Sequence, residues 1–75
     1  MYKVMLVDDN YPILTYLAEN IPWDDLGMTV IGTFENGLKA LEQAKRTVPD
    51  ILITDIGMPV MNGLELIENV QKLNP

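Results

Sequence analysis

Two residue types that often carry protein chemistry are missing from this chain, which contains neither cysteine nor histidine. Without cysteine, the chain can form no disulfide, no thiolate metal site and no cysteine nucleophile. Without histidine, a histidine general base and a histidine-ligated zinc are excluded as well. The chemistry that remains rests on carboxylates and other oxygen ligands.

Basic residues and long apolar stretches are also scarce. Five lysines and arginines stand against eleven aspartates and glutamates, which gives a formal net charge of −6. This charge disfavours a nucleic-acid or anionic-membrane surface and suits cations or basic partner surfaces. The apolar runs are too short for a transmembrane helix or a signal peptide, so we expect a cytoplasmic protein. At 75 residues, the chain is one small domain or part of one.

Short apolar segments alternate along the chain with segments of helical periodicity. The apolar segments predict strands at residues 2–7, 28–34 and 51–54. Helices are predicted by apolar positions at helical spacing from Ile13 to Ile21, Leu38 to Val48 and Leu64 to Leu73. Pro22 and Pro49 mark the ends of the first two helices, and Trp23 is expected to anchor the connection that follows by packing. This alternation is typical of an α/β fold with right-handed parallel crossovers.

Aspartates directly follow two of the predicted strands. Asp8 and Asp9 come after the first strand, and Asp55 comes after the third. In a doubly wound sheet, the ligand crevice lies beyond the carboxyl ends of the strands, where the winding reverses. The strand order 2-1-3 places the first and third strands side by side and so brings the three carboxylates to one edge. We therefore expect three parallel strands in this order, with three helices.

Three carboxylates at one edge repel one another unless a cation, a proton or a phosphoryl group lies between them. Mg²⁺ prefers such oxygen ligands and leaves room for phosphate oxygens. Asp9 is the predicted direct ligand, and Asp8 a weaker or water-mediated one. Asp55 is the predicted nucleophile, because it stands alone at its strand end beside a glycine-containing loop. Taken singly, each aspartate also fits the role of a helix cap or turn residue.

A family resemblance is carried by three motifs in order along the chain: Val7-Asp8-Asp9, residues 36–41 and residues 49–63. With these motifs, the chain resembles the receiver domain of two-component response regulators from Tyr2 to Pro75. Residues 21–28 look like the subgroup whose receivers are fused to AraC-type DNA-binding domains. The resemblance implies a flavodoxin-like fold, a phosphoacceptor at Asp55 and a sensor histidine kinase as phosphoryl donor.

The same resemblance implies a Mg²⁺ site. Its ligands would be Asp9, Asp55 and the backbone carbonyl of Gly57, with Asp8 assisting through water. No enzyme activity is expected. An alternative interpretation as a magnesium-dependent phosphatase is disfavoured, because Gly57 occupies the position of the second aspartate in an aspartate-x-aspartate nucleophile pair.

The family's domain has five strands and five helices, and this chain matches the first three pairs. Residues 1–75 are therefore expected to be the amino-terminal part of a receiver domain. They would lack the Ser or Thr of the fourth strand and the Lys of the fifth. The third strand would form an exposed apolar edge, so we expect self-association, such as a C2 homodimer through this strand. The alternative function is a half-domain without the switch that only folds, self-associates or binds a divalent metal.

Overall fold

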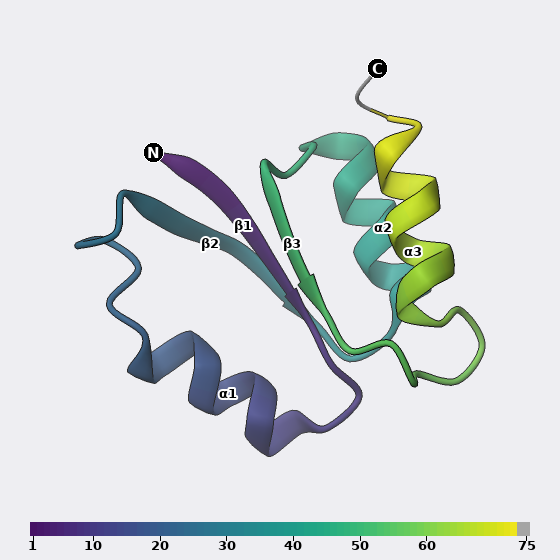
Figure 1. Ribbon diagram of the computed structural model, residues 1–75, viewed down its shortest axis with the longest axis horizontal. Helices are drawn as coiled ribbons and strands as arrows, with labels where there is room; N and C mark the ends of the chain where they lie inside the picture. The colour runs from purple at the N-terminus through teal and green to yellow at the C-terminus, as the bar shows by residue number, and fades with distance from the viewer. Residues whose placement is uncertain (74–75) are drawn as a thin grey trace.

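The computed structural model describes residues 1–73, in which three strands alternate with three helices (Figure 1). The elements are β1 (Tyr2–Val7), α1 (Tyr11–Asn20), β2 (Met28–Phe34), α2 (Gly37–Arg46), β3 (Ile51–Thr54) and α3 (Gly63–Gln71). All strand pairs are parallel, and the sheet order is β2-β1-β3. The predicted fold class and strand order are confirmed. Pro75, to which the family resemblance extends, lies outside the described residues.

The sheet is covered by helices on both faces (Figure 1). On the side of α2 and α3, the buried cluster consists of Met5, Val7, Ala40, Ala44, Met58, Leu66 and Val70. On the side of α1, it consists of Val4, Leu6 and Leu14. The β1 residues from Val4 to Val7 alternate between the two clusters and are at most 2% exposed. Burial on both faces explains why β1 reads as a continuous apolar run.

Each helix begins at an asparagine cap. The Oδ1 atoms of Asn10, Asn36 and Asn62 accept hydrogen bonds from the backbone N–H three residues later, at 3.3, 2.9 and 2.9 Å. At Asn62, the Glu65 side chain also accepts a hydrogen bond from the cap's own N–H, which completes a capping box. Asn10 and Asn36 stand within three residues of a strand end, so α1 and α2 start at the carboxyl edge of the sheet, while a longer loop leads from β3 to Asn62.

The connection between α1 and β2 is organised by Trp23. Its indole N–H donates to the Leu17 carbonyl at 3.2 Å. Its own carbonyl accepts hydrogen bonds from the backbone N–H groups of Leu26 and Met28, at 3.0 and 2.9 Å. The ring packs against the cluster of Val4, Leu6 and Leu14. The predicted anchoring role of Trp23 is therefore confirmed.

The helices are short. α2 ends at Arg46 with Thr47 as its cap, so Val48 lies beyond the helix rather than on its apolar face as expected.

Within residues 1–73, no helix is long and apolar enough to cross a membrane.

Candidate functional site

The sheet itself positions two of the three predicted acidic residues. The Asp8 N–H donates to the Phe34 carbonyl, and the Asp55 N–H donates to the Val7 carbonyl, each at 3.0 Å. Both bonds continue the strand pairing by one residue beyond the strand ends. Asp9 follows at the start of the turn into α1. The carboxyl ends of the strands converge (Figure 1), and the three aspartates follow the ends of β1 and β3 in the sequence.

The three carboxylates come together. One carboxylate oxygen from each of Asp8, Asp9 and Asp55 lies within 4.8 Å of the other two. None of these side chains is buried, and Asp9 is exposed. A hard cation at this cluster can therefore keep several of its waters, which is the coordination that Mg²⁺ favours in proteins.

Backbone N–H groups orient two of the carboxylates. Asp8 Oδ1 accepts from the Asn10 N–H at 2.9 Å, and Asp55 Oδ1 accepts from the Gly57 N–H at 3.3 Å. In each bond, the backbone N–H two residues after the aspartate donates to the aspartate side chain, which is typical of aspartate turns. The interpretation of the aspartates as turn residues is therefore compatible with their clustering. Gly57 lies beside Asp55 as expected, and its carbonyl as a metal ligand stays a prediction.

The close approach of α3 to Asp55 was not anticipated from the sequence. A Cβ atom at Gly63 would lie 2.8 Å from Ile56 Cα and would collide with the Asp55 carbonyl oxygen. The Gly63 N–H also donates to the Ile56 carbonyl at 3.0 Å. Glycine at this position therefore lets the first turn of α3 pack directly against the backbone of Asp55. In the sequence, Gly63 gives no signal beyond that of an ordinary loop glycine.

The loop between β3 and α3 also contains a strained residue. Val60 has a φ of 68°, in the left-handed region. For a residue with a Cβ atom this region costs about 1–2 kcal/mol, and β-branched residues are outliers there. Val60 is 83% exposed, whereas Met58 in the same loop is 4% exposed and packs into the core. Met58 therefore anchors the loop by packing into the core, while Val60, at the strained position, is exposed to solvent. No sequence signal indicates this strain.

The acidic cluster is an open surface site. Two surface hollows, of about 440 and 310 Å³, occur elsewhere among residues 1–73, and no aspartate of the cluster lines either of them. A site of this kind suits an ion and a small anionic group better than an organic ligand, which usually binds in an enclosed pocket.

Comparison with known proteins identifies the family. The family model for the response regulator receiver domain matches residues 4–75. The uncharacterized transcriptional regulatory protein YesN of Bacillus subtilis is 45% identical over 75 residues, which are 100% of this chain and 20% of YesN. The chain therefore spans a fifth of the length of that relative.

Solved structures share the fold. The REC domain of AraT, a response regulator from Geobacillus stearothermophilus, is 37% identical with a TM-score of 0.88, over 95% of this chain and 55% of that chain. A two component transcriptional regulator AraC from Clostridium phytofermentans is 34% identical with a TM-score of 0.90, over 97% and 57%. The names of these two neighbours agree with the subgroup that residues 21–28 indicated. The chain belongs to the response regulator receiver domain family, the receivers of two-component signalling.

Proposed function

We propose that the chain is the phosphoacceptor module of a two-component phosphorelay, with Asp55 as the acceptor. The supporting observation is the convergence of three carboxylates within 4.8 Å at the ends of β1 and β3. Hydrogen bonds fix both the backbone and the side chain of Asp55, since its N–H donates to the Val7 carbonyl and its Oδ1 accepts from the Gly57 N–H. By the similarity to YesN, the module would serve transcription regulation, and we propose the cytoplasm as its compartment.

From the family of the chain, we propose the phosphohistidine of a sensor histidine kinase as the donor. The chain has no histidine of its own, which fits this assignment. In the transfer, a carboxylate oxygen of Asp55 forms a bond to phosphorus while the phosphorus–nitrogen bond on the kinase breaks. The departing imidazole nitrogen takes a proton from solvent, and Asp55 carries an acyl phosphate. Asp8 and Asp9 do not react in this step.

The chemistry of the cluster fits Mg²⁺. Oxygen ligands lie at about 2.1 Å from this ion, so ligands on opposite sides are about 4.2 Å apart. The carboxylate oxygens of the cluster, all within 4.8 Å of one another, are close to that span. We propose Asp9, Asp55 and the Gly57 carbonyl as direct ligands, with Asp8 acting through water. When bound, the ion supplies positive charge that stabilises the transferring phosphoryl group.

A small phosphodonor tests the acceptor. With acetyl phosphate and Mg²⁺, we expect mass spectrometry to find one added phosphoryl group on the chain and none on Asp55→Asn. Asp25→Asn removes an exposed carboxylate outside the cluster and is the matched control, which should be labelled normally. Equal labelling of Asp55→Asn would contradict the assignment. An unlabelled chain that still binds Mg²⁺ would favour the alternative of a half-domain without the switch.

Asp9→Asn tests the metal site separately from the acceptor. Removing one of three like charges should stabilise the metal-free fold and also weaken Mg²⁺ binding. We therefore expect this variant to melt above the unmodified chain in EDTA, but to gain less in Tm from added MgCl₂. A gain from MgCl₂ equal to that of the unmodified chain would rule out Asp9 as a ligand.

We further propose that two copies of the chain associate through β3. Among the described residues, β3 pairs only with β1, so its other edge presents unpaired backbone groups. Residues 51–54 carry no charge, and Ile53 is 41% exposed. Uncharged apolar edges of this kind pair readily with another strand, and a C2 dimer through β3 would close on itself.

Sedimentation at micromolar concentration tests this association. We expect a dimer, and we expect Ile53→Lys to shift it to a monomer by placing a charge beside the edge. Leu38→Lys changes a residue of similar exposure, 47%, on α2 and should leave the dimer intact. A well-folded monomer for the unmodified chain would refute the proposal.

A further inference from the structure

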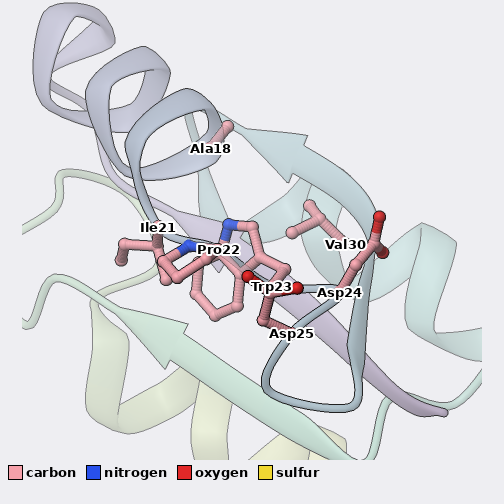
Figure 2. A pocket seen from close by; sticks show the side chains of 7 residues that line it. All are labelled: Ala18, Ile21, Pro22, Trp23, Asp24, Asp25 and Val30. Carbon is pink, nitrogen blue, oxygen red and sulfur yellow. The ribbon is translucent and has the colours of Figure 1, made fainter.

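The connection between α1 and β2 leaves a hollow of about 440 Å³ that opens to solvent (Figure 2). Its lining residues are Ala18, Ile21, Pro22, Trp23, Asp24, Asp25 and Val30. The connection leads into the start of β2, and its Gly27 carbonyl accepts a hydrogen bond from Tyr2 at the start of β1. The hollow therefore lies toward the amino ends of the strands, whereas the acidic cluster lies at their carboxyl ends. No residue is shared between the two sites.

An aromatic ring and two carboxylates line this hollow. The Trp23 ring is partly buried, and its orientation is held by the 3.2 Å hydrogen bond from its indole N–H to Leu17. Asp24 and Asp25 are both exposed. Both residues line the hollow, and Figure 2 shows the Asp25 carboxylate beside the Trp23 ring and the Asp24 carboxylate on the side of Val30. The hollow therefore offers an aromatic ring with a carboxylate beside it, and a second carboxylate on its other side.

The end of α1 adds to the negative potential of the hollow. The carboxyl end of a helix carries a partial negative charge, which a basic residue in the last turn often offsets. α1 has no basic residue in its last turn, and Ala18 and Ile21 at this end line the hollow. Packing of the Trp23 ring accounts for the anchored loop. That packing does not require two neighbouring carboxylates beside a helix end that lacks a basic residue.

We propose that this hollow binds a cationic side chain, specifically an arginine on an exposed segment of a partner protein. A guanidinium group stacks on a tryptophan face and pairs with a single carboxylate through two parallel hydrogen bonds. Trp23 offers the first interaction, the carboxylate of Asp25 beside it offers the second, and Asp24 adds negative charge to the hollow. The net charge of −6 attracts a basic partner. The same charges repel nucleic acids and anionic membranes.

The single tryptophan of the chain provides a direct readout, because its fluorescence arises from the hollow itself. The probe is the peptide acetyl-Gly-Arg-Gly-amide, and its citrulline analogue keeps the shape of arginine without the charge. We expect a saturable change in Trp23 fluorescence with the arginine peptide and no saturable change with the analogue. Equal responses to both peptides, or a response to arginine that never saturates, would overturn the proposal.

Variants of the chain locate the binding. In the double variant Asp24→Asn, Asp25→Asn, we expect affinity for the arginine peptide to fall about tenfold. Glu19→Gln removes an exposed carboxylate of α1 that does not line the hollow and should bind as the unmodified chain does. Asp9→Asn should also bind normally, which separates this surface from the proposed metal site. Undiminished affinity in the double variant, with its circular dichroism unchanged, would refute the assignment.

Discussion

Gly57 and Gly63 flank the same loop but differ in the space around them. At Gly57, a Cβ atom would meet nothing within 4 Å. At Gly63, it would meet the backbone of Asp55 and Ile56, and backbone atoms cannot move aside as a side chain can. A larger residue at position 63 would therefore displace the backbone of Asp55, the proposed acceptor.

Gly63→Ala is expected to lower the free energy of unfolding by about 1–3 kcal/mol, the usual cost of overpacking. Gly57→Ala should change it by less than about 0.5 kcal/mol, because the added methyl group is unobstructed. Urea denaturation followed by circular dichroism measures both variants. Equal losses in the two variants would show that α3 does not pack against the Asp55 backbone as closely as described.

The helix starts show how local chemistry shapes the site. Asn62 combines a 2.9 Å cap bond with the returning Glu65 side chain, while Asn10 makes only a 3.3 Å cap bond. The cap at Asn62 also fixes the helix turn that contacts Asp55. A stronger cap therefore stands where the proposed site needs a rigid support.

Asn62→Ala is expected to cost about 1 kcal/mol of stability, and Asn10→Ala less. The loss at Asn62 should also appear as faster hydrogen exchange at the Glu65 amide, whose partner is the Asn62 side chain. Chemical denaturation and NMR-detected exchange test both expectations. The capping argument would be wrong if Asn10→Ala proved the more damaging change.

The end of α2 shows where local rules were insufficient. Pro49 predicted a helix through Val48, yet the helix stops at Arg46. The reason lies in the start of β3, since Asp50 exchanges hydrogen bonds with the Lys3 backbone at 2.7 and 2.9 Å. To reach Lys3, the chain must leave the helix early. That requirement comes from a residue far away in sequence, and periodicity does not report it.

The two core clusters lie on opposite faces of the sheet, and both are built on β1. Cores of domains this small supply only about 3–5 kcal/mol. Neither face can therefore be lost while the other stays folded. The three strands and three helices should unfold as one cooperative unit.

Leu66→Ala tests this coupling. Leu66 is fully buried on the α3 side, and its truncation should cost about 2–5 kcal/mol. Trp23 packs on the α1 side, so its fluorescence should nonetheless report the same lowered denaturation midpoint as circular dichroism. Leu64→Ala, on the same helix but 56% exposed, is the control and should have little effect. A Trp23 transition unaffected by Leu66→Ala would mean that the two faces unfold independently.

Much of this protein could be predicted from local patterns. The strand positions and the aspartates after β1 and β3 follow from periodicity and residue type within a few positions. The strand order 2-1-3 followed from where the aspartates stood. The family's motifs, which occur in order along the chain, supported this strand order because the resemblance implies a flavodoxin-like fold.

Other features depend on contacts between residues far apart in sequence. The 4.8 Å grouping of carboxylates requires the pairing of β1 with β3, and the place of Gly63 requires α3 to dock behind Asp55. The strain at Val60 and the hollow beside Trp23 arise in the same way, from how elements meet. Patterns within the sequence show which side chains are available at each strand end. Packing between distant segments sets the distances that turn them into a site.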